Sequence, residues 1–191
     1  RHRGAGRDGR RDALGEGVQG LVPGQRVATA TAHGTWAEYF VVPAKGLVPM
    51  PDTIDDPTAA QLIAMPLSAL MLLEYLAVSP GDWIRQNTAN GAVGKTLAML
   101  AAARGVHAIN LVRSAAGLEE LAALGIDHAI DTSQPGWKDA VRECAATPIV
   151  AAVDSIGGKA SGDLLALLGE NGTLVSFGSM SGEPVQISSG D

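Results

Sequence analysis

The chain reads Gln86-Asn87-Thr88-Ala89-Asn90-Gly91-Ala92-Val93-Gly94 at the junction between an apolar run and a helical pattern. The apolar run Trp83-Ile84 precedes this stretch, and apolar residues recur at helical spacing from Val93 to Ala101. The pattern predicts a strand, a glycine-bearing turn and a helix. The first main-chain N–H groups of such a helix are free, and its dipole attracts anions. We therefore expect a turn that binds a diphosphate.

The glycines of this turn follow the dinucleotide fingerprint G-x-G-x-x-G, except that Ala89 stands in the first position. Gly91 is expected to let the main chain approach the phosphates, and Gly94 to let the helix pack closely on the strand. On its own, the pattern also fits an ordinary strand-to-helix turn. The predicted cofactor contacts of the turn are Ala89, Asn90, Gly91, Ala92, Val93 and Gly94.

A second strand is predicted at 107–112, directly before Arg113 and Ser114. In NAD-binding folds an acidic residue about 20 residues beyond the glycines holds the ribose 2′-hydroxyl. The guanidinium of Arg113 suits a 2′-phosphate instead, through bidentate charge-assisted hydrogen bonds. We therefore predict that Arg113 and Ser114 contact the cofactor and that NADPH is preferred to NADH. The alternative for Arg113 is a solvated residue at the start of a helix.

Composition excludes several classes of protein. The 191 residues carry a formal net charge of -6, which argues against a nucleic-acid partner. No uninterrupted apolar run is long enough to predict a membrane span. Cys144 is the only cysteine, so an internal disulfide is excluded. A single cysteine fits a reducing compartment, and we expect a cytoplasmic location.

The pattern of the chain divides it into three parts. Residues 1–16 are rich in arginine and glycine and are expected to be disordered. Residues 17–55 predict β-structure, including a strand at 34–42 with Trp36 and Tyr39. Residues 56–191 predict a nucleotide-binding domain that begins at Asp56-Pro57, with the aspartate as helix N-cap. That first helix is expected to stop or kink near Pro66.

From residue 83 onward, strands and helices alternate. Five strands are predicted near 83–84, 107–112, 128–131, 148–153 and 172–177. Further helices are predicted over 115–124, 137–145 and 159–168. Such alternation indicates an α/β fold with a doubly wound parallel sheet.

The motifs together resemble the medium-chain dehydrogenase/reductase superfamily. The resemblance rests on Gly34-Thr35-Trp36-Ala37-Glu38-Tyr39, Val48-Pro49-Met50-Pro51-Asp52, Gly81-Asp82-Trp83, the 89–94 turn, Leu124-Gly125-Ile126-Asp127-His128 and Gly172-Thr173-Leu174-Val175. It implies the end of a GroES-like β domain over 17–55. It also implies a Rossmann domain over 56–191 that is incomplete at its C-terminus, in a chain truncated at both ends.

Within the superfamily, the chain is similar to the zinc-free branch. A single cysteine cannot form the structural zinc lobe of the zinc alcohol dehydrogenases, and His33, His107 and His128 have no partner at ligand spacing, so no metal is expected. This branch contains the quinone oxidoreductases and the 2-enoyl thioester reductases, and the closest resemblance is to the 2-enoyl thioester reductases. It implies that Phe177, Gly178, Ser179 and Met180 lie against the nicotinamide half of the cofactor. Alternatively, these four residues form a connecting turn.

The resemblance implies a reaction in which NADPH delivers a hydride to the activated C=C of a 2-enoyl thioester. A quinone is the alternative small-molecule substrate, and a full-length homodimer is expected. The family's proton-donating tyrosine lies upstream of Arg1, so no catalytic residue is assigned here. Two further hypotheses remain open: a catalytically incomplete nucleotide-binding fragment, and a redox-neutral protein on the same scaffold.

Overall fold

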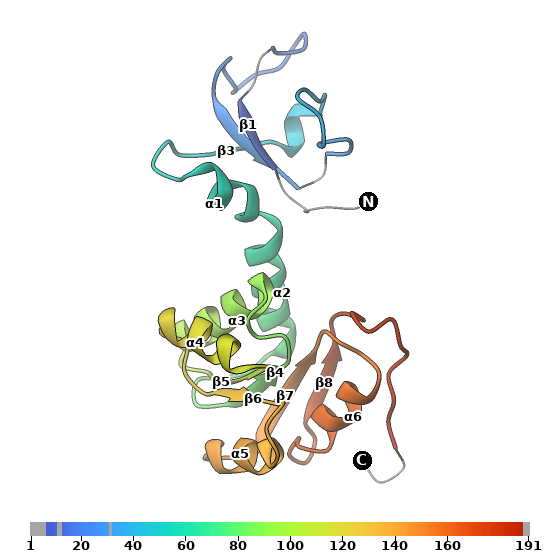
Figure 1. Cartoon of the computed structure of the whole chain (residues 1–191). Coiled ribbons are helices and arrows are strands. Elements are labelled where there is room, and N and C mark those ends of the chain that lie inside the picture. Colours follow the sequence, from blue (N-terminus) through green and yellow to red (C-terminus); the bar gives the residue numbers. More distant parts are fainter. Residues whose placement is uncertain (1–6, 11–12, 31, 189–191) are drawn as a thin grey trace. The chain divides into compact units, whose positions relative to one another are not determined.

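A computed structural model describes residues 7–10, 13–30 and 32–188. Contacts within the chain divide it into two units, Arg1–Ser68 and Ala69–Asp191. The division falls inside helix α2 (Ala64–Leu76), whereas the sequence pattern placed a boundary between residues 55 and 56. Each unit has its own sheet (Figure 1).

The first unit contains a three-stranded antiparallel sheet with the order β1-β2-β3. Its strands are β1 (Arg7–Arg10), β2 (Arg26–Thr29) and β3 (Val48–Pro49), and a short 3-10 helix, η1 (Ala44–Gly46), precedes β3. The disorder predicted for residues 1–16 is therefore wrong at β1, because β2 offers this segment a main-chain partner. Residues 1–6 and 11–12 lie outside the described part of the chain.

The strand predicted over 34–42 is wrong, since the structure has no strand there. Trp36, Tyr39 and Val41 are exposed, with Val41 at 99%. The edge strands of this sheet are β1 and β3, and residues 34–42 pair with neither of them. Aromatic and β-branched residues alone were not sufficient to form a strand in this stretch.

The helical segment begins one residue earlier than predicted. Asp55, not Asp56, is the N-cap of α1 (Asp56–Gln61), and its side chain accepts a hydrogen bond from the Thr58 N–H at 2.8 Å. That hydrogen bond lowers the pKa of the Asp55 carboxyl. The break predicted near Pro66 is confirmed, because α1 ends at residue 61 and Pro66 lies in the first turn of α2.

The second unit holds a five-stranded parallel sheet with the order β6-β5-β4-β7-β8. Its strands are β4 (Trp83–Gln86), β5 (His107–Val112), β6 (Ala129–Asp131), β7 (Ile149–Asp154) and β8 (Thr173–Ser176). The helices between them are α3 (Ala92–Ala103), α4 (Ala115–Ala123), α5 (Trp137–Cys144) and α6 (Lys159–Leu165). The predicted doubly wound Rossmann sheet is confirmed.

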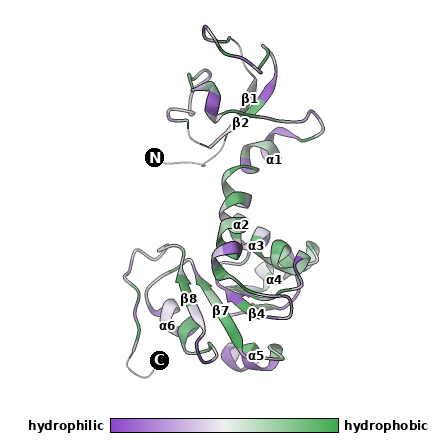
Figure 2. Cartoon of the chain, turned by 180° about the vertical axis from the view of Figure 1, so that it is seen from behind, coloured by the Kyte–Doolittle hydropathy of each residue, from purple (hydrophilic) through white to green (hydrophobic). Residues whose placement is uncertain are grey.

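Helices cover both faces of this sheet (Figure 1). On one face, α2 and α3 pack on the strands around Ile84 and Leu97. On the other face, α5 and α6 pack around Val141 and Leu164. Figure 2 shows β7 and β8 as mostly apolar, as expected for strands covered on both sides. No helix in the described ranges is both long and apolar enough to cross a bilayer.

Candidate functional site

The predicted cofactor residues gather at one edge of the parallel sheet. Because all five strands run the same way, the 89–94 turn after β4, Arg113 after β5 and Phe177 after β8 all follow carboxyl ends. Strand β4 lies between β5 and β7, where the direction of strand order reverses. Ligands of doubly wound sheets bind at this crossover point. The strand order therefore brings the three predicted segments to the place where such folds bind nucleotides.

The 89–94 turn presents main-chain donors that the protein itself does not use. Gly91 is the N-cap of α3, and no side chain caps this helix. In the described part of the chain, the N–H groups of Asn90, Ala92, Val93 and Gly94 donate to no protein acceptor. Three or four free amides at the positive end of a helix form an anion-binding site.

Gly94 explains why the turn is so tight. A Cβ at this position would lie 2.8 Å from the main-chain Cα and O of Ala89 and from the O of Thr88. A Cβ at Gly91 would approach only the Thr88 oxygen, at 3.2 Å. The glycine at 94 is thus required by helix packing, as predicted. The free amides at the start of α3 and the missing side chain at Gly91 are the features that a diphosphate site requires.

Two buried polar residues, Gln86 and Asn110, fix the position of the turn through hydrogen bonds. The Gln86 Nε2 donates to the Gly94 oxygen and to the Asn110 Oδ1, both at 2.8 Å. The Ala89 N–H donates to the Leu111 oxygen at 3.2 Å. These bonds tie α3 and the turn to both β4 and β5. No such role was predicted for Gln86 or Asn110 from the sequence.

Arg113 and Ser114 follow β5, as predicted. Arg113 is exposed and makes no ion pair with the described residues. The Ser114 Oγ caps helix α4 by accepting a hydrogen bond from the Gly117 N–H at 3.3 Å. Its hydroxyl hydrogen stays available for a second partner. The guanidinium is therefore free to meet an anion next to the start of α4.

An ion pair links α4 to the turn. The Glu120 carboxylate on α4 binds Lys95 on α3, and it also accepts a long hydrogen bond of 3.4 Å from the Asn90 side chain. The hydrogen bond from Lys95, followed by that from Asn90, lowers the pKa of Glu120. The side chain of Asn90 is thus occupied, while its main-chain N–H is not.

The segment 177–180 leaves β8 beside the loop that follows β7. The N–H groups of Phe177 and Gly178 donate to the main-chain carbonyl oxygen of Asp154, at 2.7 and 3.1 Å. Phe177 is 42% exposed and Met180 is 75% exposed, so both have apolar surface available to a ligand. The structure thus places the four predicted residues at the expected edge of the sheet.

No role was predicted for Asp154 from the sequence, although this residue ends β7 and shortly precedes Gly157-Gly158. Its carboxylate is fully buried and is bound to the side chains of Asn87 and Ser161. Burial alone would raise the pKa of this group, but hydrogen bonds from Ser161, Asn87 and two main-chain amides together lower it. Asp154 is therefore ionised at neutral pH inside the sheet edge.

A second cluster of polar rings lies at the opposite, amino edge of the sheet. Trp83 stacks on His107 with ring centres 4.6 Å apart, and the His128 ring is 4.9 Å from Trp83. The Cys144 Sγ lies 3.5 Å from the His128 Nδ1, and burial raises the pKa of this thiol. The described residues contain no group of three or more His, Cys, Asp or Glu side chains arranged to hold a metal ion.

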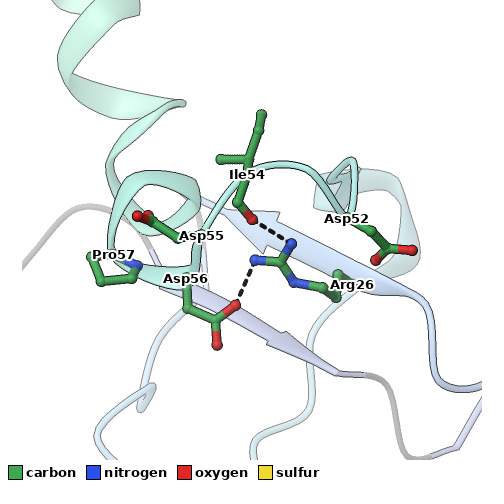
Figure 3. Close-up of a pocket in the computed structure, with 6 residues that line it drawn as sticks. All are labelled: Arg26, Asp52, Ile54, Asp55, Asp56 and Pro57. Atoms are coloured by element: carbon green, nitrogen blue, oxygen red, sulfur yellow. Dashed lines mark hydrogen bonds and ion pairs between the residues drawn. The ribbon is translucent and has the colours of Figure 1, made fainter.

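A cavity of about 570 Å³ in the first unit does not involve any predicted site residue (Figure 3). Its lining consists of Arg26, Asp52, Ile54, Asp55, Asp56 and Pro57. The Arg26 guanidinium donates to the Ile54 oxygen at 2.6 Å and to the Asp56 carboxylate at 2.5 Å. Arg26 thereby fixes the segment before α1 on strand β2, which is a structural role.

The family model described as zinc-binding dehydrogenase matches residues 92–191. Among curated proteins, the chain is similar to the human mitochondrial enoyl-[acyl-carrier-protein] reductase. The two are 34% identical over 182 residues, which cover 91% of this chain and 48% of that protein. The chain spans about half the length of the curated relatives it matches.

Two solved structures share the fold over nearly the whole chain. One is described as an NADPH:quinone reductase from Bacillus thuringiensis, with a TM-score of 0.86, 34% identity and coverage of 96% of this chain and 56% of that chain. The other is a mycobacterial protein in complex with NADPH, with a TM-score of 0.83, 30% identity and coverage of 98% and 59%. The chain therefore belongs to the zinc-binding dehydrogenase family, in the zinc-free branch of the medium-chain dehydrogenase/reductase superfamily.

Proposed function

We propose that this protein is a zinc-independent, NADPH-dependent reductase that reduces the activated C=C of a 2-enoyl thioester. One observation carries the proposal: the free amides of the 89–94 turn lie at the crossover point of the sheet, next to Arg113, which follows β5 and makes no ion pair with the described residues. The human relative, named as an enoyl-[acyl-carrier-protein] reductase, supports the substrate class. The mycobacterial structure with NADPH supports the cofactor.

Different residues of the site would bind different parts of the cofactor. The amides of Asn90, Ala92, Val93 and Gly94 would hold the diphosphate, and Arg113 would hold the 2′-phosphate with help from the Ser114 hydroxyl. The segment 177–180 would lie against the nicotinamide half. When bound, NADPH supplies the hydride. This chain's part is to orient the cofactor and keep water from it, and no proton donor is assigned among its residues.

A quinone is the second candidate substrate, favoured by the Bacillus thuringiensis structure at 34% identity. Quinone reduction requires less proton-transfer machinery than enoyl reduction. A nucleotide-binding fragment without catalysis is the third candidate. The full-length protein is proposed to be a homodimer. A cytoplasmic location is proposed because a single cysteine suits a reducing compartment.

The test uses the purified chain and NADPH. Binding is measured first, by quenching of tryptophan fluorescence. Oxidation of NADPH is then followed at its absorbance band, with a crotonyl thioester in one arm and a benzoquinone in the other. We expect binding, and faster turnover of the crotonyl thioester than of the quinone. Faster turnover of the quinone would favour the second candidate, and binding without turnover the third. Absence of NADPH binding would refute all three.

A further inference from the structure

We propose that Asp154 is a positioning residue that holds the 177–181 segment, called here the nicotinamide-side loop, against the diphosphate-binding turn. The proposal rests on the proposed function, because it assumes that both segments contact one dinucleotide. Asp154 ends β7, which lies between β4 and β8 in the sheet. It is thus placed between the two segments that must act together.

The side chain of Asp154 is fully used. Its Oδ1 accepts hydrogen bonds from the Asn87 Nδ2 at 2.6 Å and from the Ile156 N–H at 2.9 Å. The Gly157 N–H donates to both oxygens at 3.2 Å, and the Ser161 Oγ donates to Oδ2 at 2.5 Å. The carboxylate therefore fixes the conformation of the loop after β7. The Asn87, Ile156 and Gly157 donors come from the loop and from the residue that follows β4, and together with Ser161 they offset the cost of burying the carboxylate.

The nicotinamide-side loop is hydrogen-bonded to the main chain of residues 154–156, whose conformation the Asp154 carboxylate fixes. Phe177 and Gly178 donate to the main-chain carbonyl oxygen of Asp154, and the Met180 N–H donates to the main-chain oxygen of Ser155 at 3.1 Å. The Ser181 N–H donates to the Ile156 oxygen at 2.9 Å. A Cβ at Gly178 would lie only 3.1 Å from the Ser155 oxygen, so the two loops are in close contact.

Asn87, which lies just before the turn, connects the loop after β7 to the turn. Its Nδ2 donates to Asp154, and its Oδ1 accepts a hydrogen bond from the Ser155 N–H at 2.7 Å. The turn itself has further supports that do not involve Asp154, from Gln86 to Gly94 and from Ala89 to Leu111. Loss of the carboxylate should therefore displace the nicotinamide-side loop much more than the turn.

The experiment compares two ligands on the Asp154→Ala variant. NADPH needs both segments, whereas adenosine 2′,5′-bisphosphate (2′,5′-ADP) has no nicotinamide half and needs only Arg113 and the turn. We expect the Kd for NADPH to rise by about tenfold, because the nicotinamide half loses contacts of the displaced loop while the contacts of Arg113 and the turn remain. The Kd for 2′,5′-ADP should change by less than about twofold. Fluorescence titration or calorimetry measures both constants.

Ser161→Ala is the matched control. It removes a hydrogen bond to the same buried carboxylate but none to either loop, so both constants should stay within about twofold of the wild type. Circular dichroism and thermal melting report whether each variant folds. If Asp154→Ala does not fold, Asp154→Asn replaces it. The asparagine keeps an acceptor for Asn87 and Ile156, so we expect a smaller loss of NADPH affinity, of about threefold, and again an unchanged constant for 2′,5′-ADP.

Equal losses of affinity for the two ligands would overturn the proposal, since they would show that Asp154 supports the diphosphate-binding turn as much as the nicotinamide-side loop. An unchanged Kd for NADPH would overturn it as well. If the wild-type chain binds neither ligand, the proposed function fails instead. The wild-type titration thus separates the failure of the function from the failure of the positioning role.

Discussion

Arg85 is a charged side chain in the middle of the sheet. It is fully buried in β4, between Ile109 of β5 and Ala152 of β7. Among the described residues, its Nε and both Nη atoms have no hydrogen-bond partner. Burial lowers the pKa of this guanidinium to about 10. An unpaired buried charge costs several kcal/mol, so Arg85 weakens the fold.

Replacing this arginine by a neutral side chain of similar length should stabilise the protein. For Arg85→Met we expect the free energy of unfolding to rise by about 3 kcal/mol, because burial of the unpaired charge lowers the pKa of Arg85 to about 10. Urea denaturation at pH 7 measures this change. Arg104→Met, which removes an exposed arginine paired with Glu74, is the control and should change stability by less than about 1 kcal/mol.

The difference in stability between the wild type and Arg85→Met should depend on pH. Above about pH 10 the folded chain loses the Arg85 proton while the unfolded chain still holds it, because burial lowers the pKa of this group only in the folded state. The stability of the wild type therefore rises with pH in this window relative to that of Arg85→Met, and the difference between the two proteins narrows. A variant that is no more stable than the wild type at pH 7 would contradict the assignment of Arg85 as an unpaired charge.

Arg113 determines cofactor choice in our proposal. For Arg113→Glu we expect the Kd for NADPH to rise by about a hundredfold, because a carboxylate repels the 2′-phosphate that the guanidinium attracts. Binding of NADH should weaken by no more than about threefold. Fluorescence titration with each cofactor gives both constants. Arg142→Glu, on helix α5, controls for the change in net charge. Equal losses for NADPH and NADH would refute the 2′-phosphate assignment.

At the level of the elements, the two glycines between β4 and α3 have different roles: Gly94 is needed for helix packing, and Gly91 is proposed to be needed for cofactor binding. In Gly94→Ala the new methyl group would overlap main-chain atoms at 2.8 Å, so we expect a loss of about 1–3 kcal/mol of stability. In Gly91→Ala the φ of -74° suits any residue and the nearest atom is 3.2 Å away. This second variant should keep its melting temperature but bind NADPH less tightly. Equal melting temperatures for Gly94→Ala and the wild type would disprove the packing role.

The elements of the second unit followed their sequence patterns closely. The predicted strand at 107–112 is β5, and the strand predicted at 148–153 is β7, one residue later at each end. The first unit followed its pattern less well, as the missing strand at 34–42 shows. A helix or a buried parallel strand carries its signal in its own residues, whereas an antiparallel strand exists only if a neighbour pairs with it.

At the scale of the whole molecule, every residue predicted to contact the cofactor lies in the unit Ala69–Asp191. The first unit supplies none of them. This explains why the cofactor was predictable while the substrate was not: the cofactor residues belong to one continuous β-α alternation. The substrate remains a proposal, since the chain spans about half the length of its relatives.

Periodicity was enough to predict the Rossmann sheet, which the structure confirms, while glycine spacing and the arginine after β5 predict an anion-binding turn and a preference for a 2′-phosphate. These features are local, because a turn or a helix end takes its chemistry from residues next to each other in the chain. Strand order is not local, and it alone brought Asn87 and Asp154, 67 residues apart, into one hydrogen-bonded pair. The same packing enclosed Arg85 without a partner, which no pattern in its neighbouring residues revealed.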